Sequence, residues 1–396
     1  MIARCLALRL ACTIVLSGAV SHVVAAQGPT KRVVDITAPD GVVLKGTLFV
    51  AATAGPAVLL LHQCDEQRSV WEPLGTRLAR SGVTVLAIDY RGYGESGGTP
   101  HDKLSLADLG AISAEKWPAD LDAAFAFLSR QPGDDTTRMA AAGGSCGVRA
   151  AVYVARHHPN VKALALLAGG TDRAGRAFLA SADAPPLFTA AAADDRYADF
   201  VSIMGWHAAL SRNSQSRMAQ YRDGGHAAIV FRAHPGLADT MATWFAEVLK
   251  ARRGTLPRTN GVPMRASVLA VLDELDRPGG AAVVGKRLAA LRARKADAQL
   301  FPEYFANQLG YEHLQQMNDP AGALAIMKLN AQAYPASPNA MDSLGDIYLA
   351  TGDKMAALQT ARTTLQLLDK DTVDTAARKK DIRSAAEQKV RQLSGR

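Results

Sequence analysis

The sequence predicts an α/β protein with a doubly wound, mostly parallel sheet of eight strands, followed by an all-α domain of helical repeats. Between residues 31 and 253, short apolar runs alternate with amphipathic stretches, as in successive strand–helix units. After a segment rich in Gly, Pro and polar residues at 253–263, the chain reads as helical throughout. With 396 residues, 48% hydrophobic and 21% charged, the chain is long enough and apolar enough for both units.

Residues 1–26 are typical of a secretory signal peptide. Arg4 and Arg9 precede an apolar run of about eleven residues, and small residues end the segment at Ala26. A membrane span needs roughly 20 apolar residues, so an uncleaved anchor is the weaker alternative. We expect an exported protein, periplasmic or extracellular, with cleavage near Ala26 and no membrane span after the segment is removed.

The mature domain of residues 27–252 should contain the sheet. Continuous apolar runs such as Ala57–His62 and Val83–Asp89 suit parallel strands that are buried on both faces. No helix separates the first two strands, so they should form an antiparallel hairpin at one edge. The expected strands are Arg32–Ile36, Val42–Phe49, Ala57–His62, Val83–Asp89, Arg138–Gly143, Val161–Ala168, Pro186–Ala192 and Arg217–Tyr221. The expected helices are Val70–Ser81, Trp117–Ser129, Gly147–His157, Asp199–Leu210 and Leu237–Arg252.

The second domain, residues 264–396, follows the linker at 253–263 and repeats with a period of about 34–35 residues. Leu309-Gly310 recurs as Leu344-Gly345, and the second copy continues with Tyr348. This spacing resembles the tetratricopeptide pattern, which predicts two helix–turn–helix repeats at about 301–335 and 338–371. Helices around 266–296 and 374–394 should cap them. The repeats either bind a protein partner or bury surface against the first domain or a second subunit.

The strongest local motif is Gly143-Gly144-Ser145-Cys146-Gly147, a G-x-S-x-G sequence between a predicted strand and a predicted helix. A serine on such a sharp turn projects its hydroxyl above the end of the strand, and side chains at the flanking glycines would collide with neighbouring backbone. The helix that follows directs its N–H groups to the same point. Ser145 is therefore the candidate nucleophile.

Other motifs lie at matching positions. Asp89-x-Arg91-Gly92-x-Gly94-x-Ser96 closes the fourth strand, and His62 ends the third. Together with G-x-S-x-G, these make the chain from about 31 to 252 resemble an α/β-hydrolase, closest to the dienelactone-hydrolase-like and small esterase branches. The resemblance implies hydrolysis at a carbonyl group.

A serine nucleophile needs a base, and the base needs an orienting acid. The family order places the acid after the seventh strand, where its spacing from the opening proline selects Asp195, with Asp194 as the alternative. The base should follow the last strand, where Gly224-Gly225-His226-Ala227 resembles the family's G-x-G-H-G loop. His226 is the candidate base, and His207 and His234 are the rivals.

The resemblance also implies the oxyanion donors, which are backbone N–H groups. One belongs to Cys146, and the other to Cys64, or to Gln63, which replaces the family's usual glycine. The two cysteines are near neighbours in this fold, so we expect a Cys64–Cys146 disulfide. The alternative, a Cys146 nucleophile, would require glycine at position 148, where the chain has Val148.

The sequence thus predicts a serine hydrolase acting on a small-molecule or polymer-borne ester. A peptidase, an acyltransferase, a perhydrolase or a silent scaffold that binds partners through the repeats are the alternatives. Because lids usually follow the sixth strand and only about 17 residues lie there, Gly169–Pro185, the site should be fairly open. The larger insertion is Gly97–Lys116, with Trp117 shaping one wall. We expect no cofactor, no metal and no nucleic-acid partner, since His residues lack ligand spacing and basic residues are interleaved with acids.

Overall fold

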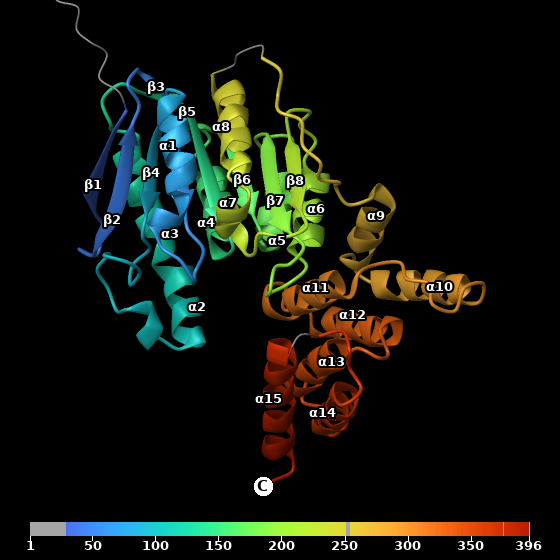
Figure 1. Ribbon diagram of the computed structural model, residues 1–396. Helices are drawn as coiled ribbons and strands as arrows, with labels where there is room; N and C mark the ends of the chain where they lie inside the picture. Colours follow the sequence, from blue (N-terminus) through green and yellow to red (C-terminus); the bar gives the residue numbers. More distant parts are fainter. Residues whose placement is uncertain (1–28, 251–253, 375, 396) are drawn as a thin grey trace, which may run out of the picture.

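The computed structural model describes residues 29–250, 254–374 and 376–395, so the predicted signal peptide lies outside the described residues. An eight-stranded sheet with the order β1-β2-β4-β3-β5-β6-β7-β8 forms the first unit (Figure 1). The β1–β2 and β2–β4 pairs are antiparallel and the other pairs are parallel, which confirms the predicted mostly parallel sheet and its edge hairpin. The strands are β1 (Thr30–Thr37), β2 (Val43–Val50), β3 (Gly55–Leu61), β4 (Thr84–Ile88), β5 (Asp134–Gly144), β6 (Val161–Leu167), β7 (Leu187–Ala192) and β8 (Arg217–Tyr221).

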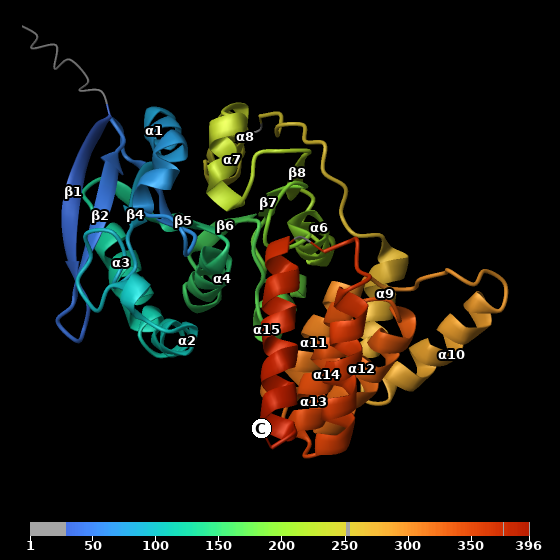
Figure 2. The ribbon, with the colours of Figure 1, turned by 60° about the horizontal axis from the view of Figure 1, so that its bottom comes forward.

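Helices cover both faces of this sheet, because the central strands are apolar on both sides. Every residue of β4 is buried, as are Pro56 to Leu61 of β3. Helices α1 (Glu72–Arg80) and α8 (Gly236–Leu249) pack together on one face. Helices α3 (Trp117–Leu128), α4 (Cys146–His157) and α6 (Phe200–Leu210) lie on the other (Figure 2), and α5 (Arg173–Ala180) packs against α4 and α6.

Two connections contain helices that the sequence analysis did not anticipate. The insertion at 97–116 folds into the short helix η2 (His101–Lys103) and into α2 (Leu106–Glu115), whose first turn is capped by the Ser105 side chain. The segment between β6 and β7 forms α5, which packs against α4 and α6 as part of the sheet's helical layer. Short one-turn elements η1 (Arg68–Trp71), η3 (Ala227–Ile229) and α7 (Val230–Ala233) complete this unit.

The rest of the described chain is helical, as predicted. The helices are α9 (Ala266–Leu275), α10 (Gly280–Arg292), α11 (Glu303–Gln315), α12 (Pro320–Ala333), α13 (Pro338–Ala350), α14 (Lys354–Leu368) and α15 (Ala376–Leu393). The pairs α11–α12 and α13–α14 pack closely and fall within the two predicted repeats. Their assignment to the tetratricopeptide pattern stays a prediction.

The helical unit is docked on the sheet unit through a buried contact. Arg176 of α5 makes a two-pronged ion pair with Glu312 of α11, and both side chains are less than 10% exposed. The Arg176 guanidinium also lies over the ring of Trp206, which meets Phe305 edge to face at 4.8 Å. Apolar residues of α11 therefore continue the core of the sheet unit.

The described part of the predicted linker is bound along its length. Gly261 N donates to Met218 O, and the Asn260 side chain forms two hydrogen bonds with the backbone of Gln220. These contacts occupy backbone groups at the outer edge of β8, where an uncovered strand could pair with another chain. Within the described residues, no helix is both long and apolar enough to cross a membrane.

Candidate active site

The turn between β5 and α4 holds Ser145 in a strained backbone conformation, with φ 53° and ψ −119°. Its N–H donates to Leu167 O at 2.9 Å, which fixes the turn to the neighbouring strand. A Cβ at Gly143 would lie 1.9 Å from Gly147 O, and a Cβ at Gly147 would lie 2.4 Å from Leu61 O. Both glycines of the motif are therefore required by close backbone approach.

Two loops from the same end of the sheet bring His226 and Asp195 together. His226 Nδ1 lies 2.6 Å from Asp195 Oδ2, and their side chains are 5% and 1% exposed. A carboxylate accepts hydrogen bonds and donates none, so the imidazole donates through Nδ1 and leaves Nε2 as the acceptor. His226 and Ser145 line the same cavity. The backbone N–H of Tyr197 donates to the other Asp195 oxygen at 3.0 Å.

Asp194 occupies a different position. Its two carboxylate oxygens accept from the backbone N–H groups of Gly224 and Gly225, at 3.1 and 2.9 Å. Asp194 thus holds the loop that carries His226, while Asp195 contacts the imidazole itself. Ala227, which stands where the family has glycine, adopts a positive φ of 48°.

The rival histidines lie elsewhere and do not line the cavity that holds Ser145. His207 is buried in α6, and burial, with a smaller effect of the Arg176 charge, lowers its pKa to about 3. His234 bonds through Nε2 to Asp223 Oδ1 at 2.7 Å and stacks on Tyr221.

The predicted disulfide is present between Cys64 and Cys146, with their Cα atoms 5.9 Å apart and a sequence separation of 82. Cys146 begins α4 directly after Ser145, and Cys64 follows the end of β3. Both line the cavity. The bond joins the loop after β3 to the Ser145 turn, and it removes the Cys146 thiol as a competing nucleophile.

Gln63 makes a second connection from the same loop. Its fully buried side chain donates from Nε2 to His226 O at 3.2 Å and accepts at Oε1 from Ala228 N at 2.9 Å. One amide therefore satisfies a backbone acceptor and a backbone donor on either side of Ala227. The sequence named Gln63 as a departure from glycine and as the alternative oxyanion donor, but no sequence signal indicated this contact of its side chain with the His226 loop.

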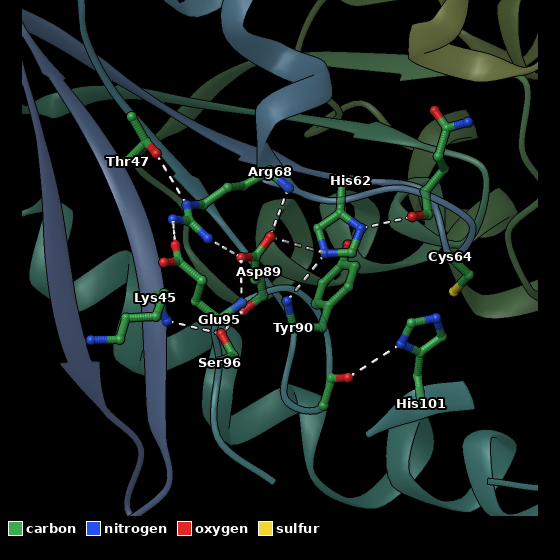
Figure 3. Close-up of polar contacts among 12 residues, drawn as sticks. Lys45, Thr47, His62, Cys64, Arg68, Asp89, Tyr90, Glu95, Ser96 and His101 are labelled. Atoms are coloured by element: carbon green, nitrogen blue, oxygen red, sulfur yellow. Dashed lines mark hydrogen bonds and ion pairs between the residues drawn. The ribbon is translucent and has the colours of Figure 1, made fainter. Parts of the chain in front are cut away.

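His62 holds the peptide that joins Gln63 to Cys64 (Figure 3). Its ring is fully buried, Nδ1 lies 2.7 Å from Gln63 O, and Nε2 accepts from Tyr90 N at 3.2 Å. Burial lowers the His62 pKa to about 4, so the ring is neutral with its proton on Nδ1. Because the peptide is planar and trans, holding Gln63 O also sets the opposite direction for the Cys64 N–H.

An ion network that is only partly buried lies beside His62, with Asp89 Oδ1 4.0 Å from His62 Nε2, and Figure 3 shows its members. Asp89 accepts from the Arg68 N–H at 2.7 Å and pairs with the Arg68 guanidinium, which also pairs with Glu95. Ser96 bridges Asp89 O and the Lys45 N–H, both at 2.8 Å. These contacts explain why the D-x-R-G-x-G-x-S turn has an aspartate at Asp89 and a serine at Ser96. No sequence signal identified Arg68 as the partner of Asp89.

Gly94 and Arg91 of the same D-x-R-G-x-G-x-S turn also have structural roles. A Cβ at Gly94 would lie 2.1 Å from an Asp89 carboxylate oxygen, so only glycine fits there. Arg91 pairs with the buried Asp120 of α3 and with Asp40, and these contacts hold the turn against the sheet.

A cavity of about 970 Å³ opens at Ser145. Its lining comes from the loop after β3, helices α2, α3 and α4, the loop after β6, the loops that carry Asp195 and His226, and Tyr304 of α11. Trp117 lines it as well and stacks on Tyr90 at 3.9 Å. Among the described residues, no group of three or more His, Cys, Asp or Glu side chains is placed to hold a metal ion.

Comparison with known proteins matches part of the sheet unit to a family. Residues 53–196, which include β3 to β7 and the Ser145 turn, match the family described as serine aminopeptidase, S33. The first unit has the α/β-hydrolase fold. Its sheet order, the strained turn at Ser145 and this family match support a hydrolase.

Individual relatives cover limited parts of the chain. An uncharacterized protein of Mycobacterium tuberculosis is 35% identical over 133 residues, 33% of this chain and 43% of its own length. The thiohydrolase aneE of Aspergillus aculeatus is 31% identical over 103 residues, 26% of this chain and 30% of its own. The chain thus matches less than half the length of these relatives. The esterase Pf2001 of Pyrococcus furiosus aligns with a TM-score of 0.45 at 18% identity, covering 56% of this chain and 94% of that one.

Proposed function

We propose that the protein is an exported serine hydrolase that cleaves a carboxylic ester or a related acyl bond through Ser145, His226 and Asp195. The observation that carries the proposal is the 2.6 Å contact between a nearly inaccessible Asp195 and His226, which lines the same cavity as Ser145 on its strained turn. A buried carboxylate on Nδ1 leaves Nε2 to accept the serine proton.

The reaction follows from these roles. Ser145 Oγ attacks the substrate carbonyl carbon while His226 Nε2 takes the hydroxyl proton, and the carbonyl oxygen becomes an oxyanion. The Cys146 and Cys64 N–H groups donate to that oxygen. As the C–O bond breaks, His226 returns the proton to the leaving alcohol, and an acyl-Ser145 remains. Water then attacks the acyl carbon while His226 Nε2 takes its proton; as the bond to Ser145 Oγ breaks, His226 returns that proton to Oγ, which releases the acid and free Ser145.

Fluorophosphonate labelling tests the nucleophile. The wild-type protein should be labelled and Ser145→Ala should not, while thermal unfolding shows that both are folded. A panel of p-nitrophenyl esters then measures the esterase activity. An unlabelled wild-type protein refutes the serine hydrolase, and unchanged labelling of Ser145→Ala moves the nucleophile elsewhere.

A peptidase is the second candidate, because the matching family is described as a serine aminopeptidase. Aminoacyl p-nitroanilides distinguish the two: an ester hydrolase turns over the esters and leaves the anilides intact. Export is tested separately by sequencing the N-terminus of the protein recovered outside the cytoplasm, which should begin after Ala26.

A further inference from the structure

The cavity at Ser145 extends well beyond the catalytic residues, along one face of α4. Cys146, Arg149, Ala150, Tyr153 and Arg156 line it, and their spacing of three and four residues places them on one side of the helix. The lining runs to His157, the last residue of the 12-residue helix, which spans roughly 18 Å. Helix α4 is thus the floor of a long cleft that begins at the nucleophile.

The insertion after β4 forms the first wall. Leu109, Gly110, Ser113 and Ala114 of α2 face the cleft, followed by apolar residues of α3 that include Leu121. The Gly110 position is open, since a Cβ built there meets no atom within 4 Å. A side chain introduced at position 110 therefore has room to extend into the cleft.

The loop after β6 and the helical unit form the second wall. Gly169 packs on the nucleophile turn so closely that a Cβ would lie 2.2 Å from Ser145 O. Two residues away, Thr171 O accepts from Gln308 of α11 at 3.3 Å and from Arg176, the partner of Glu312, at 3.2 Å. Helix α11 therefore braces this loop from outside the sheet unit.

Helix α11 also reaches the cleft directly, because Tyr304 is one of the lining residues. Its ring is fixed edge to face against Phe305, which in turn packs on Trp206 of the sheet unit. The segment between β6 and β7 forms only α5, and α5 belongs to the layer on the sheet. The wall that a cap would otherwise supply at this point comes from a later part of the chain.

We propose that α11 completes the substrate cleft and that the cleft takes an elongated, largely apolar group of the ester. This inference rests on the proposed function. A volume near 970 Å³ is at the upper end for small-molecule sites, and most of the side chains along the two walls and the floor carry apolar surface. Each methylene placed there leaves water, so binding should strengthen with chain length until the cleft is filled.

Two ester series show which side of the ester occupies the cleft. p-Nitrophenyl esters from acetate to dodecanoate lengthen the acyl group, and acetates of ethanol to dodecanol, followed by acid release, lengthen the alcohol. In one series kcat/KM should rise at least about tenfold from the shortest member. If both series are flat while fluorophosphonate still labels Ser145, the cleft assignment is wrong and the hydrolase stands. If labelling is absent, the proposed function itself fails.

Gly110→Trp places a bulky ring in the cleft. It should lower the long-to-short ratio of kcat/KM in the responsive series at least about tenfold. The matched control is Gly236→Trp, since Gly236 is an exposed helical glycine on α8 with equally open surroundings and does not line the cleft. An unchanged ratio in Gly110→Trp, with the protein folded, overturns the apolar cleft.

Tyr304→Ala tests the contribution of α11. The same ratio should fall about tenfold or more, with Tyr304→Phe restoring it because the ring and not the hydroxyl forms the wall. Thermal unfolding identifies loss of folding as a separate effect. An unchanged ratio in a folded Tyr304→Ala protein would show that the helical unit takes no part in substrate selection.

Discussion

Opening the Cys64–Cys146 disulfide should both destabilise the protein and slow the reaction. The bond closes a loop of 82 residues. Loop-closure entropy for that length gives about 4.5 kcal/mol of stabilisation, through restriction of the unfolded chain. The same bond holds together the two backbone N–H groups that are proposed to bind the oxyanion. Loss of one such donor costs about 10²- to 10³-fold in kcat, and a loosened loop should cost up to that amount.

The assay compares oxidised protein, protein reduced with a phosphine, and the Cys64→Ala/Cys146→Ala double variant, which keeps both backbone N–H groups. Urea unfolding followed by tryptophan fluorescence gives the stability, and p-nitrophenyl ester kinetics give kcat and KM. We expect lower unfolding midpoints in both altered forms, with kcat reduced more than KM is changed. If thiol titration finds two free thiols after reduction and neither stability nor kcat has changed, the bond has neither role.

Four further changes should have distinct effects. Asp195→Asn should lower kcat about 10⁴-fold, whereas Asp194→Asn, which keeps one acceptor oxygen for the His226 loop, should lower it much less; ester kinetics on folded variants measure both. Gln63→Leu leaves a buried C=O and a buried N–H unpaired, so unfolding should show a loss of about 1–3 kcal/mol for each group and kcat should fall, with Gln63→Glu restoring only the acceptor. Glu312→Gln leaves a buried arginine charge unpaired and should cost about 3–5 kcal/mol in urea unfolding. The folded pKa of His207, about 3, lies below its usual 6.5, so only the unfolded chain gains a proton as the pH falls. The contribution of neutral His207 to the free energy of unfolding is therefore fully present above pH 6.5. It declines by about 1.4 kcal/mol per pH unit as the pH falls from 6.5 toward 3, and thermal unfolding of His207→Phe should show a shallower dependence on pH.

The sheet could be predicted from sequence because its signals are local. Continuous apolar runs in β3 and β4 identify strands buried on both faces, and the glycines around Ser145 identify a turn that other residues cannot adopt. The order of Ser145, Asp195 and His226 along the chain was sufficient to choose a serine and a histidine that line one cavity, and a carboxylate that contacts that histidine. Spacing favoured Asp195 over Asp194, and the structure places Asp195 on the imidazole.

Contacts between distant segments could not be predicted from the sequence. Nothing near Arg68 shows that its guanidinium will meet Asp89 and Glu95, because that meeting depends on the packing of η1 against the turn after β4. Likewise, Arg176 and Glu312 are 136 residues apart, and the local sequence around each one indicates only an ordinary surface charge. Helix α2 was expected as an irregular insertion, since Leu106–Glu115 contains Gly110 and follows a stretch rich in glycine.

The contacts around Ser145 share one physical consequence. The Cys64–Cys146 bond ties the loop after β3 to the Ser145 turn, and Gln63, the residue before Cys64, ties it to the backbone of His226 and Ala228. A displacement of this one loop would therefore move the proposed oxyanion donor, the Ser145 turn and the proposed base together. Stabilisation of a transition state depends on donors that are already in place before charge develops. Because Gln63 and Cys64 are consecutive, they link all three groups and keep their relative geometry fixed. The cleft walls from α2 and α11 can then contact different substrates without changing that geometry.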